Sequence, residues 1–384
     1  MNSFFHEQMS KFLLNIVNQE LSMPYINLIS PANPEISIAQ NDIAGFMQKA
    51  MRLNDENSRK LRAIFRMSGI QRRHTVIPDY QFSDDKDWSF YPPLNNGKAL
   101  PNTGDRMQLF EKHALPLAQK SLEKVFERYE AKEFTHLITV SCTGMFAPGL
   151  DIQLIKKTGL NSDIERTSIQ FMGCFAAFNA LKTAHHIARS EKDAKVLIVC
   201  VELCTIHFQS EFSEDNLLAN TLFGDGASSV VVSNEKTKDA LEMKAFKSVV
   251  ENDSEQEMAW NIGNLGFEMK LSSYVPEVIA QNIAKLGEEL MEKLSLTLKD
   301  INQFAIHPGG KRILEAVEKG LKLPSEINAS AYKILREFGN MSSPTVLFVL
   351  HEMWNKIQPK DKVLSFAFGP GLTMESMLLE RVEK

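Results

Sequence analysis

Apolar runs alternate along this chain with segments whose apolar residues recur at helical spacing. Helical spacing predicts a helix over residues 43–68, interrupted near Asn54, and a long helix over residues 106–131 after a Pro-Asn-Thr-Gly turn. Strands that alternate with helices indicate an α/β fold, in which helices cover the faces of a sheet. The apolar runs predict buried strands at residues 25–29, 135–140, 196–201 and 227–232.

The first residues of the chain carry a helical pattern of their own. Apolar side chains from Phe5 to Val17 fall on one stripe of a helix over residues 4–21. We interpret residues 1–23 as an N-terminal helical arm that packs on its own chain or on a second copy. No segment contains the roughly 18 apolar residues of a membrane-spanning helix, and no basic start precedes an apolar run as in a signal peptide.

Several residues and short motifs in the first half of the chain have counterparts in the second half at a nearly constant separation. A Phe-Gly-x-Gly motif followed by an apolar run also occurs in both halves. This recurrence indicates a duplicated α/β unit, with residues 24–238 and 239–384 as the two halves and the polar segment 234–239 as the linker. Cys142, Cys174 and Lys195 have counterparts in His307, Asn340 and Lys362, at separations of 165, 166 and 167 residues.

The duplication predicts where a site would form. In open α/β sheets, ligands bind beyond the carboxyl ends of the strands, near the place where two halves meet. Cys174, His307 and Asn340 all fall at predicted strand-to-helix junctions. Equivalent positions of the two halves can therefore face one pocket.

The composition narrows the functional classes. Of the 384 residues, 43% are hydrophobic and 24% are charged, as in soluble globular proteins, and the net charge of -5 gives no reason to expect nucleic-acid binding. No pair of cysteines has CxxC spacing and no Cys/His cluster has zinc-finger spacing, so we expect no metal and free thiols in a reducing cytoplasm. The four cysteines are Cys142, Cys174, Cys200 and Cys204.

Three segments carry residues suited to catalysis. Cys174 stands between a strand-like run and small residues that begin a helix, where the positive end of the helix dipole favours a thiolate. The alternative for Cys174 is an inert buried cysteine. His307 ends a predicted strand before Pro-Gly-Gly, where its imidazole would lie beside exposed backbone. The alternative is a loop histidine whose hydrogen bonds are satisfied within its own loop. Asn340 can present its amide to a ligand, or simply cap the helix that follows.

Taken together, these segments resemble the type III polyketide synthases, the chalcone-synthase-like branch of the thiolase superfamily. The resemblance covers residues 25–384 and implies an α/β fold, the thiolase-like duplicated αβαβα five-layer fold, in a homodimer. The Cys-His-Asn set alone would also fit ketoacyl-carrier-protein synthase III, but the motifs at 339–343 and 368–372 favour the polyketide branch. The motifs are Gly-Cys-Phe-Ala at 173–176, Ile-His-Pro-Gly-Gly at 306–310, Gly-Asn-Met-Ser-Ser at 339–343 and Phe-Gly-Pro-Gly-Leu at 368–372.

The resemblance implies roles for the catalytic residues. Cys174 would accept the acyl group as a thioester. His307 would hold Cys174 as a thiolate and donate to the thioester oxygen, and Asn340 would supply a second donor. Two preorganised donors of this kind suit the enolate that forms when a malonyl thioester loses carbon dioxide, an effect of roughly 2.7–4 kcal/mol per donor.

The resemblance also implies which residues bind substrate. Phe223 would lie between the entrance tunnel and the pocket, and the second aromatic gatekeeper of the family aligns with Met269, with Phe267 two residues away. Coenzyme A would contact Lys60 and the pantetheine arm would pass Gly309. A second basic position of the family falls on Ala63, so the neighbouring Arg62 or Arg66 is a candidate substitute. The starter and cyclisation pocket would be lined by Cys142, Cys204, His207 and Ser342.

The implied activity is that of an acyltransferase. It would condense malonyl-CoA repeatedly onto an acyl starter, delivered by coenzyme A or by a carrier protein, and cyclise the product without a further cofactor. One alternative is a single-condensation ketoacyl synthase III, and another is a non-catalytic scaffold subunit with the same fold. A long-chain acyl starter would give alkylpyrones or alkylresorcinols, and a malonyl starter would give a polyhydroxylated aromatic product. Met269 favours the acyl starter, because a flexible methionine in place of an aromatic ring makes the pocket more pliable. Cys142 leaves the malonyl starter open.

Overall fold

A computed structural model describes residues 23–82, 84–93, 97–252, 254 and 257–383 of the chain. The helical arm predicted over residues 4–21 lies outside the described residues. A nine-stranded sheet runs through the centre of the molecule in the order β11-β12-β13-β8-β1-β7-β6-β4-β5. No helix in the described ranges is both long and apolar enough to cross a membrane.

The sheet is built twice from the same strand pattern. In the first half, β4 and β6 are parallel, and β7 and β1 follow as antiparallel strands. In the second half, β11 and β12 are parallel, and β13 and β8 follow as antiparallel strands. The strands of the first half are β1 (Tyr25–Ala32), β4 (His136–Ser141), β5 (Glu165–Gln170), β6 (Lys195–Leu203) and β7 (Asp225–Ser233). Those of the second half are β8 (Leu241–Val250), β11 (Gln303–Ile306), β12 (Lys362–Gly369) and β13 (Thr373–Arg381).

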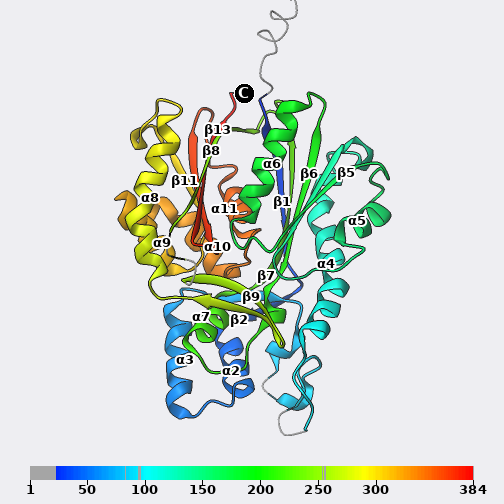
Figure 1. The fold of residues 1–384 in the computed structure, drawn as a ribbon, viewed down its shortest axis with the longest axis vertical. Coiled ribbons are helices and arrows are strands. Elements are labelled where there is room, and N and C mark those ends of the chain that lie inside the picture. The colour runs from blue at the N-terminus through cyan, green and yellow to red at the C-terminus, as the bar shows by residue number, and fades with distance from the viewer. Residues whose placement is uncertain (1–22, 83, 94–96, 253, 255–256, 384) are drawn as a thin grey trace, which may run out of the picture.

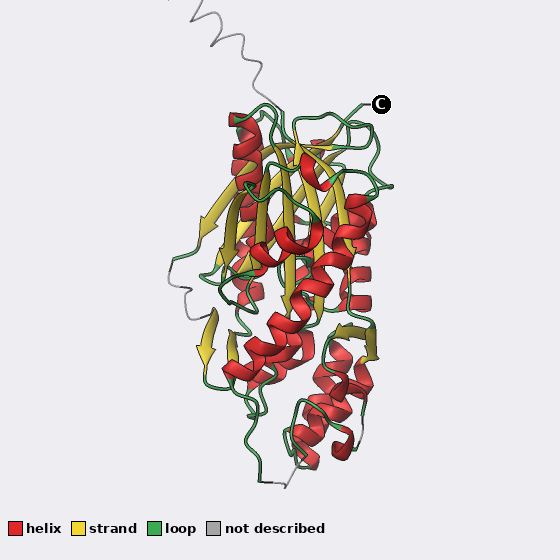
Figure 2. Ribbon diagram, turned by 90° about the vertical axis from the view of Figure 1, so that its right-hand side faces the viewer, coloured by secondary structure: helices red, strands yellow, loops and turns green. Residues whose placement is uncertain are grey.

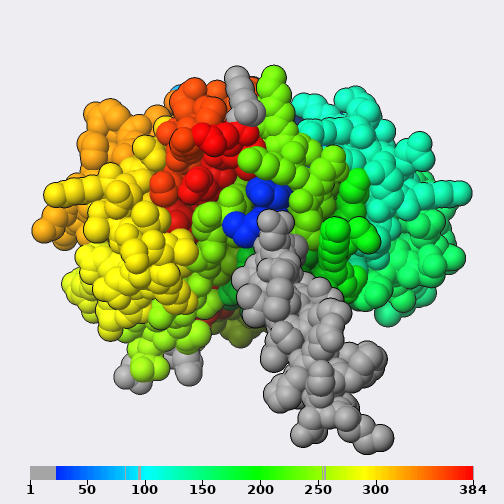
Figure 3. Space-filling model, turned by 90° about the horizontal axis from the view of Figure 1, so that it is seen from above, coloured from blue at the N-terminus to red at the C-terminus, as the bar shows by residue number. Residues whose placement is uncertain are grey.

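The two halves meet at a short seam. β1 and β8 pair only at Tyr25 with Glu242 and at Ile26 with Leu241. Viewed from above, the N-terminal half in blue to green and the C-terminal half in yellow to red occupy opposite sides of the molecule (Figure 3). This arrangement supports the division into residues 24–238 and 239–384, which we keep as a proposal.

Helices cover both outer faces of the sheet and fill the space between its halves, which gives five layers. The outer helices are α4 (Thr103–Phe126) and α5 (Leu150–Thr158) on one side, and α8 (Val275–Glu292) and α9 (Lys311–Leu321) on the other (Figure 1). Between them, α6 (Ala176–Ser190) packs on strands of both halves, and so does α11 (Thr345–Met353). The predicted α/β fold with thiolase-like αβαβα layering is therefore confirmed.

The elements outside the five layers gather mainly at one end of the sheet (Figure 2). They include the hairpin formed by β9 (Met258–Gly263) and β10 (Gly266–Leu271), which closes over the site described below. The remaining elements are α2 (Gln40–Ala50), α3 (Asp55–Met67), α7 (Glu214–Leu222), α10 (Ala329–Phe338), β2 (Ile36–Ala39) and β3 (Arg72–Thr75). Short 3₁₀ helices lie at Pro78–Gln81, Asp85–Asp87, Ala131–Glu133, Cys204–His207, Leu298–Asp300 and Ser325–Asn328.

Capping residues explain where the predicted helices differ from the observed ones. The break predicted near Asn54 is confirmed, because the Asn54 side chain accepts the amide hydrogen of Asn57 and starts α3. The long helix begins at Thr103 rather than Arg106, because Asn102 and Asp105 form a capping box. It ends at Phe126, five residues earlier than predicted.

Candidate active site

Cys174 is held at a sharp bend between β5 and α6. The preceding Gly173 has a φ of +86°, and a Cβ atom there would lie 2.4 Å from Cδ of Pro370. Only glycine fits this conformation and this close contact. Cys174 is therefore fixed just before the first turn of α6, and its side chain is buried with 8% exposed.

His307 follows β11 and is completely buried. Its main-chain amide donates to the carbonyl of Phe366 at 2.8 Å, which continues the pairing of β11 with β12. Neither ring nitrogen has a hydrogen-bond partner in the described part of the chain. Because buried polar atoms are almost always paired, this imidazole is placed to bind a ligand rather than to satisfy its own loop.

Asn340 does not cap a helix, and the capping interpretation was wrong. It lies in the connection between α10 and α11, where Pro344 occupies the capping position, so it is also not at a strand-to-helix junction. Its main chain bridges to Phe223, with hydrogen bonds to Leu222 and Gly224. The side chain is positioned as well, because Oδ1 accepts the amide hydrogen of Ser342 at 2.8 Å.

The three side chains meet at one cavity of about 460 Å³. Nδ2 of Asn340 lies 3.8 Å from Sγ of Cys174, and His307 lines the same wall. The mouth of the cavity lies between α3 and the start of α9, where Gly309 is exposed to the cavity. Apolar residues make up much of the remaining lining, namely Ile64, Met67, Leu218, Leu222, Met258, Leu271, Val275, Pro276, Ile313 and Phe368.

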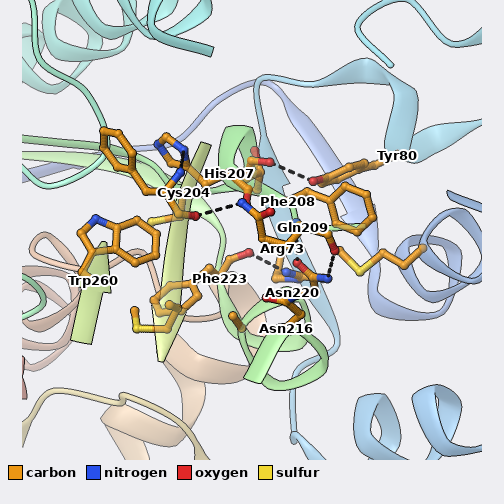
Figure 4. Close-up of a pocket in the computed structure, with 15 residues that line it drawn as sticks. Arg73, Tyr80, Cys204, His207, Phe208, Gln209, Asn216, Asn220, Phe223 and Trp260 are labelled. Atoms are coloured by element: carbon orange, nitrogen blue, oxygen red, sulfur yellow. Dashed lines mark hydrogen bonds between the residues drawn. The ribbon is translucent and has the colours of Figure 1, made fainter. Parts of the chain in front are cut away.

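A second, much smaller cavity lies deeper in the molecule. Its volume is about 30 Å³, and Trp260 lies at one end of it and Tyr80 at the other (Figure 4). Phe223 and Met269 line both cavities and so form the partition between them. Cys204, His207 and Phe267 line only the inner cavity.

Aromatic stacking keeps the inner cavity small. The ring of Phe267 stacks on His207 with centroids 4.1 Å apart, and the indole of Trp260 packs edge-on against both rings. Nε1 of Trp260 donates to the carbonyl of Cys142 at 2.8 Å, which fixes the indole in place. The Cys142 thiol itself does not line either cavity but contacts the main-chain amide of Gly173 at 2.9 Å.

Burial controls the charge of Cys174 and His307. It raises the pKa of Cys174 to about 11, although hydrogen bonds from Ser342 and Asn340 act in the opposite direction. Burial also lowers the pKa of His307 to about 3. The sequence predicts that the helix N-terminus favours a thiolate. Burial outweighs that effect, so the helix N-terminus alone does not make Cys174 a thiolate. Each group is neutral on its own near pH 7, and the thiolate can form only if a nearby group takes its proton.

A buried carboxyl lies beneath the site and was not found from the sequence. Glu202, at the end of β6, accepts hydrogen bonds from Ser343 at 2.6 Å, from Thr143 at 2.8 Å and from the amide of Cys142 at 2.9 Å. Burial raises the pKa of this carboxyl. Its partners come from both halves of the chain, so Glu202 ties the two loops that support Cys174 and Asn340.

The structure places the remaining predicted residues at different distances from the cavity. Ser342 is buried with a φ of +57° and hydrogen-bonds to Cys174. Lys60 and Arg62 do not line the cavity; Lys60 pairs with Glu56 at 3.1 Å and Arg62 donates to Gln48 at 2.8 Å. Two basic residues that the sequence analysis missed do line its mouth, Lys311 and Arg312 at the start of α9. Their place directly after His-Pro-Gly-Gly was the signal that could have identified them.

Comparisons with known proteins match this arrangement. Residues 22–236 match the N-terminal domain of chalcone and stilbene synthases, and residues 242–383 match the C-terminal domain. The chain is 33% identical over 293 residues to the "Alpha-pyrone synthesis polyketide synthase-like Pks18" of Mycobacterium tuberculosis, which covers 73% of this chain and 74% of that protein. It is 29% identical over 371 residues to "Probable polyketide synthase 1" of Dictyostelium discoideum, a match to 93% of this chain but only 11% of that protein.

Solved structures agree with the sequence comparisons. The chain superposes on PKS-I from the brown alga Ectocarpus siliculosus with a TM-score of 0.87 and 27% identity, covering 95% of this chain and 100% of that one. It superposes on the C-terminal type III polyketide synthase domain of Steely1 from Dictyostelium with a TM-score of 0.85 and 26% identity, covering 94% and 99%.

Proposed function

The chain belongs to the chalcone and stilbene synthase family and is a type III polyketide synthase, and from this premise we propose that it extends an acyl starter held on Cys174. Iterative polyketide synthesis is the activity that the family matches show, and they favour neither the single-condensation enzyme nor the non-catalytic scaffold. The observation that carries the residue assignment is that Cys174, His307 and Asn340 line one buried cavity.

In the first step, the starter is loaded. His307 accepts the thiol proton of Cys174, and the thiolate attacks the carbonyl carbon of the acyl thioester. The bond between that carbon and the coenzyme A sulfur breaks, and the imidazolium returns its proton to the departing thiolate. The partnerless ring nitrogens of His307 support this role, because the proton transfer satisfies one of them.

In the second step, malonyl-CoA loses carbon dioxide. The electrons of the broken carbon–carbon bond pass into the thioester as an enolate, whose oxygen accepts hydrogen bonds from His307 and from Nδ2 of Asn340. The enolate carbon then attacks the acyl group on Cys174 and expels the thiolate, which yields a chain two carbons longer on coenzyme A. Ser342 holds the Asn340 amide so that its NH₂ group faces the cavity.

We propose an acyl starter and a short pyrone-type product. The outer cavity has the apolar lining that an acyl chain would fill, and Met269 forms part of its inner wall. The inner cavity of about 30 Å³ holds about two water molecules and leaves little space for a long polyketide. The relative from Mycobacterium tuberculosis carries α-pyrone synthesis in its name, which supports the same product class.

Both substrates are proposed to arrive as coenzyme A thioesters, with no further cofactor. Lys311 and Arg312 are placed at the mouth of the cavity to receive the phosphates, and Lys60 and Arg62 lie on the neighbouring helix α3. We propose that the chain acts as a homodimer in the cytoplasm. Four free cysteines fit a reducing compartment.

The proposal is tested by mass spectrometry of the products of the purified enzyme. The enzyme is incubated with malonyl-CoA alone and with acyl-CoA starters of increasing chain length, beside a Cys174→Ala control. We expect pyrones made by more than one condensation from an acyl starter, and none from the control. A single β-ketoacyl product, or products that persist in the Cys174→Ala enzyme, would contradict it.

A further inference from the structure

A cluster of three side chains lies at the opposite ends of β4 and β5 from the catalytic cysteine. His136 begins β4 and Glu165 begins β5, and the two residues are directly paired in the parallel ladder. Glu191 follows the last residue of α6 and completes the group. We propose that this cluster binds a divalent transition-metal ion, with Zn²⁺ as the best match.

The separations between the side-chain atoms match those of a tetrahedral ion. Nε2 of His136 lies 3.5 Å from Oε2 of Glu165 and 3.8 Å from Oε1 of Glu191. All three atoms lie within 4.8 Å of one another. Two ligand atoms about 2.1 Å from a tetrahedral zinc ion lie roughly 3.4 Å apart, so a small closure around a shared centre would complete three bonds. A water molecule would take the fourth position.

The histidine is aimed at this centre and held there. Its side chain is 94% buried, with only 6% exposed, and Nδ1 lies 2.8 Å from the hydroxyl oxygen of Thr135. That hydroxyl also receives the amide hydrogen of Lys195 and lies 3.3 Å from the Lys195 carbonyl, which fixes it from the neighbouring strand. With Nδ1 donating to Thr135, the lone pair of Nε2 faces the two carboxylates, which is the tautomer a metal ligand requires.

The carboxylates lack a competing cation. In the part of the chain that the structure describes, neither Glu165 nor Glu191 forms an ion pair with any lysine or arginine. The adjacent Lys195 is turned away and pairs with Glu133 at 2.5 Å, and Arg166 pairs with Asp151 at 2.7 Å. Two carboxylates that face one buried imidazole nitrogen are an arrangement in which a divalent cation supplies the missing positive charge.

The position of the cluster indicates what the ion would do. Glu165 begins β5, the bend at Cys174 follows, and Glu191 ends the unit after α6. A metal bound to both glutamates would therefore clamp the base of the strand-and-helix unit whose tip carries the nucleophile. β5 is the last strand of the sheet, so this clamp would hold its first residue to the end of α6.

Equilibrium dialysis of the full chain against Zn²⁺ tests the proposal. A Cys174→Ala background removes the active-site thiol as a competing ligand. We expect one zinc ion per chain in this background and an increase in melting temperature on addition of Zn²⁺. We expect both to be lost in His136→Ala. Glu191→Gln, an exposed change that leaves the buried imidazole in place, should weaken binding by about tenfold or more, and Thr135→Val by about 10–100-fold.

His113→Ala serves as the matched control, because it removes a histidine of α4 that lies outside the cluster. It should retain the stoichiometry and affinity of the parent. The proposal is wrong if the parent binds no zinc at a free concentration of about 0.1 mM, the weak limit for a specific site of three ligands. It is equally wrong if His136→Ala and Glu191→Gln bind zinc as the parent does.

Discussion

Neither Cys174 nor His307 carries a charge easily in its buried position. Burial favours the neutral thiol and the neutral imidazole, with pKa values of about 11 and about 3. Transfer of the proton from Cys174 to His307 creates two opposite charges together, and each stabilises the other in a medium of low polarity. If His307 accepts this proton, as proposed, the two residues act as a unit, and the loss of one changes the other.

Removal of His307 should make Cys174 behave as an isolated buried thiol. In His307→Gln the thiolate fraction, and with it the rate of alkylation by iodoacetamide, should rise about tenfold per pH unit from about pH 7 to pH 10, because the pKa lies near 11. The wild-type enzyme should react faster than the variant at pH 7 and depend less on pH. Mass spectrometry of the alkylated protein over time measures both rates. Equal rates in the two proteins would show that His307 does not accept the thiol proton.

Asn340 should matter more for decarboxylation than for loading of the starter. In Asn340→Ala we expect the release of carbon dioxide from malonyl-CoA to slow by about 10²–10³-fold, because one of the two enolate donors is lost. Transfer of the starter to Cys174 should slow less. Radiolabelled carbon dioxide and the mass of the acylated enzyme follow the two steps separately. Asn328→Ala, which removes a buried asparagine that bonds to Glu318 outside the cavity lining, is the control and should leave both steps unchanged.

Residues marked by a local sequence motif could be predicted from the sequence. Residues whose contacts are distant along the chain could not. Cys174 and His307 stand in short segments whose glycines and helix starts point to a site. Glu202 has no such segment, because its partners lie 59 and 141 residues away. The same limit hid His136, Glu165 and Glu191, which share no spacing typical of a metal site.

At the scale of elements, we expect the β9–β10 hairpin to limit the space for a growing chain, because Trp260, Phe267 and Met269 line the inner cavity. Trp260 on β9 lines the inner cavity, where it packs edge-on against His207 and Phe267 and donates a hydrogen bond to the carbonyl of Cys142. Trp260→Ala removes the indole, so products of the variant should contain at least one more malonyl unit than those of the wild type. Product masses measured with the same acyl-CoA starter give the answer.

A comparison with Trp260→Phe separates volume from the hydrogen bond. Phenylalanine keeps a ring in the inner cavity but cannot bond to Cys142, so this variant should retain products of wild-type length. If Trp260→Ala also gives products of wild-type length, the inner cavity does not limit extension.

The start of α9 should bind the phosphates of coenzyme A. The side chains of Lys311 and Arg312 line the cavity at the amino-terminal end of α9, where positive charge attracts anions. The double variant Lys311→Ala/Arg312→Ala should raise KM for malonyl-CoA by about tenfold, since a charge-assisted hydrogen bond contributes about 1.5 kcal/mol or more, and should leave kcat nearly unchanged. Steady-state kinetics at low and high salt measure this. Lys285→Ala on the outer helix α8 is the control, and a similar rise in KM there would contradict a local effect.

Helices and strands could be predicted where a regular apolar pattern or a continuous apolar run marks their buried face. The buried strands β4, β6 and β7 lie where their apolar runs placed them, within two residues. The β9–β10 hairpin was not anticipated, because its exposed residues alternate with side chains whose burial depends on Arg106, His207 and the cavity rather than on a continuous core. The placement of Asn340 was missed for a similar reason: its main chain pairs with Phe223 across the two halves, which no local capping rule describes.

At the scale of the whole molecule, the repeat in the sequence corresponds to the repeat in the sheet. Cys142 directly follows β4 and His307 directly follows β11, and these two strands occupy equivalent places in the two halves. The repeat is incomplete, because β5 has no equivalent among the described strands of the second half. The sheet therefore ends in β5 on one side only, and this edge carries the segment that leads to the nucleophile.

This unequal edge is also where a second copy of the chain is expected to bind. Met145 and Met172 follow β4 and β5 at the same corner of the sheet and are 41% and 39% exposed. Exposed apolar side chains beside an unpaired edge strand are typical of an interface. In an interface with twofold symmetry, each substitution occurs twice, so one charge at this corner has a doubled effect.

Light scattering coupled to size-exclusion chromatography should give a mass near twice the 43.4 kDa of one chain. Met145→Glu should lower this mass toward that of the monomer, because two buried glutamates would face each other across the symmetry axis. Val250→Glu is the matched control, since Val250 is 62% exposed at the end of β8, in the other half of the sheet, and the variant should remain a dimer. A wild-type monomer would rule out the homodimer. A Met145→Glu variant that remains a dimer would instead place the interface elsewhere on the molecule.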